Sequence, residues 1–435
     1  MKRRTFLTST GKISLLLGTS GVSALQGAKA VACSRPSVSR PEKIRLAQIG
    51  AGGQGNSLAR RFHQQKEVEV AYVCDPDSMR CNKSVKTLGA GAKPIGDFRK
   101  ALDDPSVDAV FIATPDHWHV PAALLALDAG KHVYVEKPCS HNVAEGRKLV
   151  DLAKKKNAVV QHGTHSRSLK LLANGIQALR ENVIGEVRVA KAWNVQRRGE
   201  IGKVRPSKPP NGLDYDTWVG PAEMIPYQSN RHHYNWHWWY NFGTGDAGND
   251  GVHELDIARW GLGVQSHPST AAALGGKLSF NDDQQFPDTQ FANFSFPQQK
   301  QQLSFEMRLW SKYGLMGTDN GNAFYGEGGW MLMSKRGILR VFDEQNRERD
   351  DFKLPDLHPS EHTVNFVRAL RGEETLAAPI EEGHWSSTLC HLANISTRVG
   401  ATLEFDPASE AITNHQEAAR LLSRDYRDHW GRPSV

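Results

Sequence analysis

A glycine-rich stretch near the start of the chain has the residue types and spacing needed to bind a dinucleotide. Gly50, Gly52 and Gly55 form a G-x-G-x-x-G motif directly after a buried strand predicted over 44–49. Gly50 permits a tight turn, Gly52 lets the backbone approach a pyrophosphate, and Gly55 lets the next helix, predicted over 56–64, pack on the strand. The N-terminus of that helix then faces the negative charge of the phosphates.

An acidic residue at the end of the next strand completes this pattern. A second strand is predicted over 68–74, and Asp75 follows it, twenty residues after Gly55. Asp75 is placed to bind the adenosine ribose hydroxyls and to repel a 2′-phosphate, so the pattern predicts NAD rather than NADP. Arg80 is the nearest basic residue that could reverse this preference. A glycine triplet alone could be a mere tight turn, but the strand, helix, second strand and acid together favour a Rossmann cofactor site.

Strands and helices continue to alternate up to residue 161. This alternation predicts a doubly wound parallel sheet, an α/β fold in which ligands bind at the carboxyl ends of the strands. Further strands are predicted over 108–113, 132–136 and 158–161, and further helices over 121–129 and 143–155. Besides the three glycines and Asp75, the residues expected to bind the cofactor along this crevice are Gln54, Thr114, Pro115, His117, Glu136 and Lys137.

Three further motifs resemble one known family. They are Ala-Thr-Pro-Asp-His at 113–117, Glu-Lys-Pro at 136–138, and Gly-Val-His-Glu-Leu-Asp-Ile-Ala-Arg-Trp at 251–260. Together they resemble the glucose-fructose oxidoreductase / inositol dehydrogenase / rhizopine-catabolism family. The resemblance implies a second α+β domain with a large open mixed sheet, whose face often carries the interface of a homo-oligomer. Most such proteins are NAD(P)-dependent dehydrogenases or reductases of sugars and polyols, and a few NAD-containing glycosidases are similar to them.

The resemblance also implies roles for individual residues. Lys137 matches the lysine that contacts the nicotinamide ribose and the substrate hydroxyl, His253 matches the histidine taken as general base or proton relay, and Arg167 matches an arginine after the last Rossmann strand. The chemistry is suitable, because removing a hydride from an alcohol carbon requires a base for the hydroxyl proton. The alternatives are a surface lysine before a turn proline for Lys137 and a core histidine of a helix for His253.

One position departs from the family pattern. Many relatives carry an aspartate four residues before the histidine, where this chain has Asn249. An asparagine side chain cannot take up the proton. Asp250 or Asp246 could take the part, and the sequence does not decide between them; Asp250 is our candidate for the catalytic carboxylate.

An aromatic and histidine-rich stretch at 227–242 favours a carbohydrate substrate. Aromatic faces stack on the C–H faces of sugar rings, and histidines bind hydroxyls. The alternative is that these aromatic residues belong to the core or to an interface. The expected substrate ligands are His165, Trp236, His237, Asn249 and His253.

No metal site is predicted. His232, His233, His237 and His253 invite one, but they lack a clear helical pattern and a His-Glu-x-x-His motif. The five cysteines form no C-x-x-C pair, which excludes a zinc module or a disulfide scaffold. The 54 Lys and Arg are scattered among 47 Asp and Glu, giving a net charge of +7 without a basic block, so no nucleic-acid partner is expected.

The N-terminus has the three parts of an export signal. A twin arginine at Arg3 and Arg4, an apolar region at 13–25 and Ala-Lys-Ala at 28–30 predict a Tat-type signal peptide over 1–33 and a periplasmic protein. The apolar region is too short to span a membrane. An ordinary basic N-terminus and lipid attachment at Cys33 are the alternatives.

The rest of the chain divides into a linker and two domains. The linker is predicted over 34–42, the NAD-binding Rossmann domain over 43–163, and a substrate and oligomerisation domain over 164–435. In the second domain we expect helices over 169–181, 362–370 and 385–399, strands over 185–193, 290–296, 301–309 and 337–342, and Gly-rich turns around 314–329. No role is predicted for the polar stretch 420–430.

These features predict an exported NAD-dependent oxidoreductase that exchanges a hydride at a secondary alcohol of a sugar, glycoside or polyol. Because no nucleotide pool exists outside the inner membrane, we expect the NAD to be tightly retained. One alternative is a redox-assisted glycosidase or lyase, in which a ring hydroxyl is oxidised, elimination expels the aglycone and the hydride returns. A second is a non-catalytic ligand-binding relative, since a fold does not fix a function.

Overall fold

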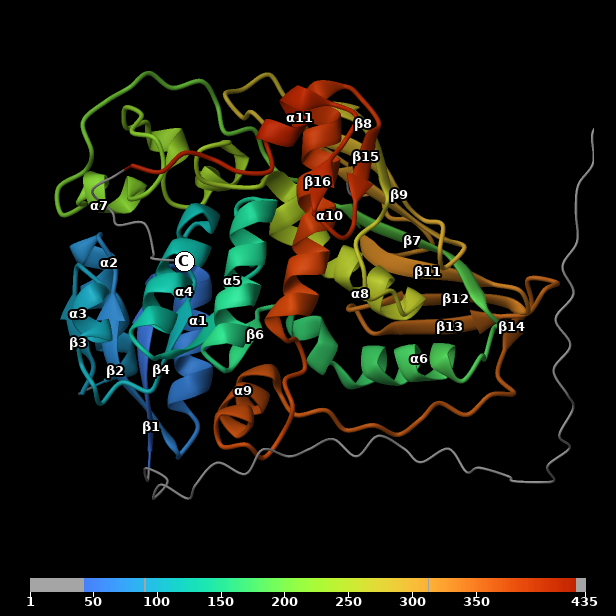
Figure 1. Ribbon diagram of the computed structural model, residues 1–435, viewed down its shortest axis with the longest axis horizontal. Helices are drawn as coiled ribbons and strands as arrows, with labels where there is room; N and C mark the ends of the chain where they lie inside the picture. The colour runs from blue at the N-terminus through green and yellow to red at the C-terminus, as the bar shows by residue number, and fades with distance from the viewer. Residues whose placement is uncertain (1–42, 90, 312, 428–435) are drawn as a thin grey trace, which may run out of the picture. The chain divides into compact units, whose positions relative to one another are not determined.

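The computed structural model describes residues 43–89, 91–311 and 313–427, and the predicted signal peptide and linker lie outside these residues (Figure 1). The first sheet has six parallel strands in the order β3-β2-β1-β4-β5-β6, which confirms the doubly wound Rossmann arrangement. Its strands are β1 Ile44–Ile49, β2 Val68–Cys74, β3 Lys93–Ile95, β4 Ala109–Ile112, β5 His132–Val135 and β6 Val160–His162. Its helices are α1 Gly53–His63, α2 Ser78–Leu88, α3 Arg99–Leu102, α4 His119–Asp128 and α5 Val143–Lys155, with a 3-10 turn η1 at Asp116–Trp118.

Helix α1 begins three residues before its predicted start. Gly53 is its first residue, because the glycine loop itself forms the first helical turn. Helix α2 was not predicted; Asp77 caps it, since its carboxylate accepts from the backbone N–H groups of Met79 and Arg80. Both helix N-termini therefore lie just after strand ends, at the edge of the sheet where a cofactor would bind.

The second sheet has ten strands in the order β14-β13-β12-β11-β7-β10-β9-β8-β15-β16. Strands β7 and β10 pair in parallel and the other paired strands are antiparallel, which confirms a large mixed sheet. The strands are β7 Val187–Val195, β8 Thr270–Gly276, β9 Thr289–Phe296, β10 Gln301–Arg308, β11 Asn320–Gly326, β12 Gly329–Ser334, β13 Ile338–Phe342, β14 Glu348–Arg349, β15 Leu403–Asp406 and β16 Ala411–Ile412.

Three helices pack on one face of this sheet: α6 Lys170–Arg180, α8 Val252–Leu262 and α10 Ile380–Val399 (Figure 1). They bury one large apolar core with the sheet. Gly-rich turns were predicted around 314–329, and this was wrong for residues 320–326, which form strand β11. There, Gly321 lies against the Trp193 side chain, where a Cβ would come within 2.7 Å, so this glycine fits a close sheet contact rather than a turn.

The chain returns to the Rossmann domain after the second sheet. Helix α9 His362–Leu370 packs against α1, and its Phe366 ring lies 6.1 Å from Phe62 and 5.8 Å from Tyr134. Helix α10 contacts α5 as well as β8. These contacts bury the C-terminal helices between the two sheets.

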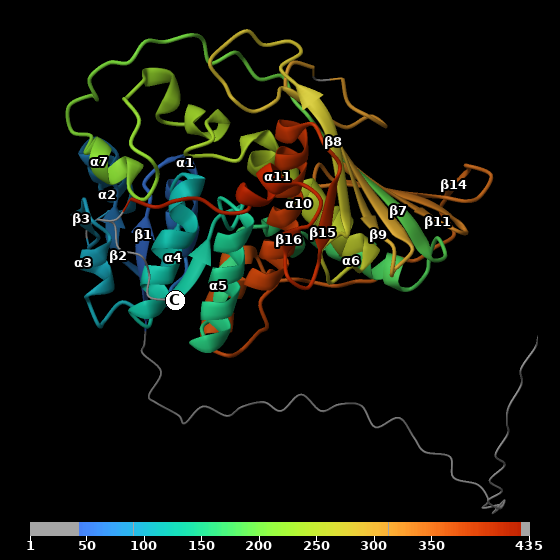
Figure 2. The same ribbon diagram turned by 45° about the horizontal axis from the view of Figure 1, so that its top comes forward.

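A long connection between β7 and α8 lies over the carboxyl ends of the Rossmann strands (Figures 1 and 2). We call residues 196–242 the covering segment; it includes α7 Tyr215–Val219 and the 3-10 turns η3 Ser229–Arg231 and η4 Asn235–Trp238. Its backbone is bonded to the end of β2, where Ser78 N donates to Gly212 O at 2.9 Å and Asp214 N donates to Pro76 O at 3.0 Å. Within the described residues, no helix has both the length and the apolar character to cross a membrane.

Candidate active site

A cavity of about 460 Å³ lies between the carboxyl ends of the Rossmann strands and the covering segment. It brings together residues from the glycine loop, from the ends of β2, β4 and β5, from η4, and from the π-helix η5 Ala247–Gly251 that precedes α8. The predicted site residues along its wall are Gly50, Gly52, Gln54, Asp75, Thr114, Pro115, Glu136, Lys137, Trp236, His237 and Asn249.

The glycine loop is shaped for close backbone approach. Gly50 has φ +97°, and a Cβ on it would lie 2.5 Å from the carbonyl oxygen of Ala113. A Cβ on Gly55 would lie 2.0 Å from the carbonyl oxygen of Gly50. Neither position tolerates a side chain, so the turn stays tight and the N-terminus of α1 remains open to the cavity, as a pyrophosphate requires.

Asp75 has the geometry of a ribose ligand. Its Oδ2 accepts from Ala51 N at 2.8 Å and its Oδ1 accepts from Asp77 N at 2.8 Å. A carboxylate has about four acceptor positions, so each oxygen retains one for a hydroxyl. Burial raises the pKa of Asp75 although the two N–H groups oppose this. These residues therefore fit the dinucleotide that the motif predicts.

Glu136 and Lys137 follow strand β5. Gln54 donates to Glu136 Oε1 at 2.8 Å, which ties the glycine loop to the end of β5. Lys137 Nζ donates to the backbone carbonyl of Asn249 at 2.7 Å, and Asn249 Oδ1 lies 3.4 Å away. The lysine thus connects the Rossmann domain to the π-helix, and its ammonium group lies on the cavity wall.

Both candidate replacements for the family carboxylate are bound by an arginine. Arg198 Nη2 lies 3.0 Å from Asp246 Oδ1 and 2.5 Å from Asp250 Oδ2. Asp246 also accepts from Asn194 at 2.8 Å and from Asn249 at 3.2 Å. Burial raises the pKa of Asp246 to about 6, whereas Lys137 and Arg198 hold the pKa of Asp250 below its usual value in spite of burial. Neither aspartate lines the cavity; Asp246 is fully buried, whereas the Asp250 side chain is 30% exposed and forms an ion pair with Arg198.

His253 lies one turn after Asn249 but behind the cavity wall. Its ring centroid is 4.9 Å from that of His165, which is exposed. Burial, with the nearby charge of Lys335, lowers the pKa of His253 well below its usual value, so the ring is neutral. The two rings make an edge-to-face contact.

Three predicted cofactor-binding residues, Gly55, His117 and Arg167, are not part of the cavity wall. Both ring nitrogens of His117 face backbone carbonyls, those of Phe242 at 3.4 Å and Trp218 at 3.0 Å. Arg167 forms a buried bidentate pair with Asp256, at 2.8 and 2.9 Å. Both side chains therefore make structural contacts. His117 contacts the backbone of the covering segment, and the Arg167 ion pair links η2 His165–Ser168 to α8.

The cavity wall contains further residues that were not among the predicted site residues. Asp116 belongs to the segment after β4 that the strand-end rule places at this crevice, and His119 follows it. Asp116 Oδ2 accepts from Thr244 Oγ1 at 2.6 Å. His119 lies between the carbonyl oxygens of Pro138 and Thr114, at 2.7 and 3.0 Å. Arg80 also lines the cavity, beside Gly52.

The aromatic stretch divides between the cavity and a small core. Tyr234, Trp236 and His237 line the cavity, and the rings of Trp236 and His237 are stacked with centroids 3.5 Å apart. Trp239 and Phe242 are buried in a separate apolar cluster within the covering segment. Trp236 also packs against this cluster, so it contacts both the cavity and the core.

The histidines that suggested a metal point to different partners. His233 Nε2 lies 2.8 Å from Asp77, His237 contacts the Tyr234 carbonyl, and His253 faces His165. The ring centroids of His232 and His233 lie 3.2 Å apart, but among the described residues these four histidines do not gather into one cluster of metal ligands.

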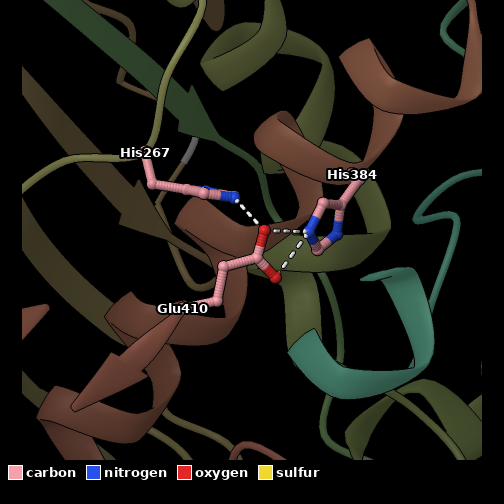
Figure 3. Close-up of side chains that lie close together, drawn as sticks. All are labelled: His267, His384 and Glu410. Atoms are coloured by element: carbon pink, nitrogen blue, oxygen red, sulfur yellow. Dashed lines mark hydrogen bonds and ion pairs between the residues drawn. The ribbon is translucent and has the colours of Figure 1, made fainter. Parts of the chain in front are cut away.

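A different cluster joins His267, His384 and Glu410 (Figure 3). Both Nε2 atoms lie 2.9–3.0 Å from the Glu410 carboxylate, and Arg147 Nε donates to the same carboxylate at 3.0 Å. A metal-bound histidine needs an acceptor for its other N–H, and neither Nδ1 has a partner within the described part of the chain. With the arginine present, this cluster is better suited to hydrogen bonding between α5, α10 and the β15–β16 turn than to metal binding.

Comparison with protein families agrees with this geometry. Residues 44–164 match a family described as "Oxidoreductase family, NAD-binding Rossmann fold", and residues 163–292 and 334–432 match its "C-terminal alpha/beta domain". The chain belongs to the glucose-fructose oxidoreductase / inositol dehydrogenase / rhizopine-catabolism family. The expectation of an NAD-binding oxidoreductase fold is therefore confirmed.

The curated relatives of this chain include proteins named as glycosidases. Glycosyl hydrolase family 109 protein 1 of Shewanella sp. strain ANA-3 is 28% identical over 204 residues, which are 42% of this chain and 44% of that protein. The alpha-N-acetylgalactosaminidase of Shewanella oneidensis is 26% identical over the same length and shares. The chain thus spans less than half the length of these relatives.

Solved structures with the same fold include sugar dehydrogenases. Levoglucosan dehydrogenase in complex with NADH and levoglucosan has a TM-score of 0.63 at 17% identity, covering 83% of this chain and 99% of that one. The WlbA dehydrogenase of Chromobacterium violaceum in complex with NADH and UDP-GlcNAcA has a TM-score of 0.66 at 18% identity, covering 86% and 99%. At this identity the likeness establishes the fold.

Proposed function

We propose that this protein is an NAD-dependent oxidoreductase that exchanges a hydride at a secondary alcohol of a sugar, glycoside or polyol. The observation that carries the proposal is a single cavity that holds the dinucleotide turn, Asp75 and Lys137 opposite a wall of Trp236 and His237. Aromatic and imidazole rings at the substrate end suit the alternating C–H and hydroxyl faces of a sugar.

Bound NAD would supply the hydride acceptor and donor. The chain supplies the rest: the Gly50 turn and the α1 N-terminus hold the pyrophosphate, and Asp75 holds the ribose hydroxyls. Lys137 keeps its ammonium at the wall through Asn249 and donates to the substrate oxygen, which stabilises negative charge developing there. His253, neutral and next to the exposed His165, relays protons between the interior and solvent.

We also propose that the cofactor is retained through the catalytic cycle. The covering segment contributes Thr217, Trp218, His233 and Tyr234 to the cavity wall. It is fastened to the Rossmann domain by the bonds at the end of β2 and by His233 on Asp77. A nucleotide beneath it can leave only if these contacts open.

The comparisons favour one second candidate. The relatives named as glycosyl hydrolase family 109 proteins support a glycosidase in which oxidation and re-reduction occur on the same sugar. Such an enzyme cleaves a glycoside with no net consumption of nucleotide. Release of p-nitrophenol from p-nitrophenyl glycosides without added NAD would identify this activity.

The test of the main proposal uses natively purified protein with its own nucleotide. A panel of sugars, glycosides and polyols is added without further NAD, and the absorbance band of reduced nicotinamide is followed. We expect at least one member to reduce the bound NAD. If the nucleotide is present as NAD and no member reduces it or releases an aglycone, both candidate activities are contradicted.

Export and assembly belong to the same proposal. The twin arginine at Arg3 and Arg4 supports Tat export to the periplasm, and cell fractionation before and after Arg3→Lys with Arg4→Lys tests it. Lipid attachment at Cys33 would appear as an added mass on the exported protein.

The open face of the second sheet exposes Leu274 and Phe291 on paired strands, which supports a homo-oligomer through that face. Light scattering after size-exclusion chromatography would measure its size.

A further inference from the structure

The proposed reaction needs a proton acceptor on the cavity wall, and Lys137 is occupied as a donor. Its Nζ donates to the Asn249 carbonyl at 2.7 Å, and an ammonium group has no lone pair with which to accept. Asn249, on the same wall, has an amide in place of a carboxylate. Position 249, which carries an aspartate in many relatives, therefore offers no proton acceptor in this chain.

The neighbouring carboxylates do not fill this gap. Asp246 and Asp250 do not line the cavity, and both form ion pairs with Arg198. Asp75 and Glu136 line the cavity, but they bond to the glycine loop through Ala51 and Gln54, at the cofactor end. His253 is not part of the wall.

One further carboxyl group lines the cavity. Asp116 follows β4, is almost fully buried at 1% exposure, and has no ion-pair partner within the described residues. Its Oδ2 accepts from Thr244 Oγ1 at 2.6 Å. Gly248 allows this packing, because a Cβ there would lie 1.9 Å from Thr244 Oγ1 and 3.3 Å from Pro138. The residues next to Lys137 and Asn249 in the sequence, Pro138 and Gly248, thus pack around Thr244, which holds Asp116.

We propose that Asp116 is the catalytic acid and base of this site, taking the place of the carboxylate that position 249 lacks. This inference rests on the proposed function. In oxidation the substrate C–H bond breaks and its electron pair leaves as hydride to bound NAD. The O–H bond breaks, its electron pair forms the carbonyl π bond, and its proton moves to Asp116. Reduction returns the same proton from the Asp116 carboxyl to the oxygen.

The surroundings of Asp116 suit a group that changes its protonation near neutral pH. The groups facing it are Lys137 after β5, His119 on α4, Thr244 before η5 and Cys390 on α10. Burial raises the pKa of Asp116 to about 7, against the opposing effects of Thr244 and Lys137. A base is most effective when its pKa lies near the working pH.

The first experiment measures the rate at which the sugar found in the panel reduces the bound NAD, between about pH 5 and about pH 9. For the wild type the rate should rise with pH and level off above about pH 7, because the carboxylate form is the base.

Asp116→Asn keeps an oxygen for Thr244 and should slow the reaction by about 10²-fold and abolish this rise. Thr244→Val removes a donor that lowers the pKa and should move the rise to higher pH. Asp128→Asn, which changes a surface carboxylate near Lys156, should leave rate and profile unchanged.

Retention of the wild-type rate or of its pH profile in Asp116→Asn would overturn the proposal. Loss of bound NAD with an unchanged profile would also overturn it, since Asp116 would then be a cofactor ligand only.

A second measurement needs no substrate and separates this inference from the proposed function. Infrared titration of the NAD-containing protein should show a protonated carboxyl signal that disappears between about pH 6 and about pH 8, to which the buried Asp246 and Glu254 also contribute. One component of this signal should be missing in Asp116→Asn and present in Asp128→Asn. If wild type and Asp116→Asn give the same bands, Asp116 does not titrate in this range and the proposal fails, whatever the sugar panel shows.

Discussion

Lys137 and Asn249 join the two domains at the candidate active site: the lysine Nζ donates to the asparagine carbonyl at 2.7 Å. Because this bond uses the backbone of Asn249, any side chain at position 249 can keep it. The Asn249 side chain donates to Asp246 at 3.2 Å and its Oδ1 lies 3.4 Å from Lys137 Nζ, so it connects the lysine to the hydrogen-bonded cluster around Arg198. The departure from the family pattern thus removes a negative charge next to Lys137, while the backbone bond that positions Lys137 does not depend on it.

Restoring the family residue is expected to destabilise this protein at high pH. Asn249→Asp replaces the donor to Asp246 with a second carboxylate, and burial already raises the pKa of Asp246 to about 6. Two facing carboxylates bind protons more tightly in the folded state than in the unfolded state. The free energy of unfolding therefore falls as the pH rises through their raised pKa values. The variant should melt several degrees below wild type at about pH 8 and close to it at about pH 5. Asn249→Ala loses the donor without adding charge; because the Asn249 hydrogen bond lowers the pKa of Asp246, its deficit should also grow above about pH 6, but by less than that of Asn249→Asp. A pH-independent Asn249→Asp deficit would contradict this account.

Lys137 and His253 should differ in how their removal affects the reaction. Lys137→Ala removes the donor on the wall and is expected to lower turnover by about 10²-fold or more without loss of bound NAD. His253→Ala interrupts the relay to His165 and should lower turnover by a similar factor, but the single-turnover rate less, because the relay acts after the hydroxyl proton has left. Measurement of both rates for both variants decides the point, and wild-type rates in either variant would remove that residue from the mechanism.

The cofactor site should prefer NAD to NADP. Asp75 repels a 2′-phosphate, whereas Arg80 on the same wall could attract one. Fluorescence titration of nucleotide-free protein should give tighter binding of NADH than of NADPH, and Asp75→Asn should narrow the difference. Arg80→Ala should weaken NADPH further if the arginine reaches that phosphate. Tighter NADPH binding by the wild type would refute the assignment of Asp75.

The end of the described chain should control cofactor retention. Arg427 donates from its backbone to Pro221 at 3.1 Å and pairs with Asp216, so it fastens the covering segment at α7. Arg424 pairs with Glu145 on α5 at 2.7 Å and anchors the same tail. Arg424→Ala combined with Arg427→Ala should speed the loss of nucleotide in dialysis by about tenfold or more. The control is Arg420→Ala, on the exposed face of α11 Gln416–Arg420. If all of these proteins lose nucleotide at the same rate, the C-terminal residues 424–427 play no part in retaining it.

The Rossmann half could be predicted closely because its signals are local. The apolar residues of β1 and β2 and the amphipathic α5 gave the observed bounds, since each segment carries its own periodicity. Strand β11 was missed because its glycines, including Gly321 against Trp193, serve long-range sheet packing that no local pattern reveals.

For the candidate site, too, the sequence could place the residues that depend on local patterns. The glycine turn, Asp75 and Lys137 follow strand ends and could be placed from the sequence. The pairing of Arg198 with Asp250 could not, because the two are 52 residues apart and meet only through the covering segment. Asp116 also follows a strand end, but its contact with Thr244, 128 residues away, could not be predicted for the same reason.

The central claim is hydride transfer between a carbohydrate and the bound nucleotide, and an isotope label tests it most directly. The sugar that reduces the bound NAD is prepared with deuterium at its secondary alcohol carbons and mixed with the natively purified protein in ordinary water. The nucleotide is then released and its mass measured. The account predicts reduced nucleotide that carries one deuterium, and none from Lys137→Ala over the same time. Reduced nucleotide without deuterium, or deuterium found in the solvent instead, would contradict it.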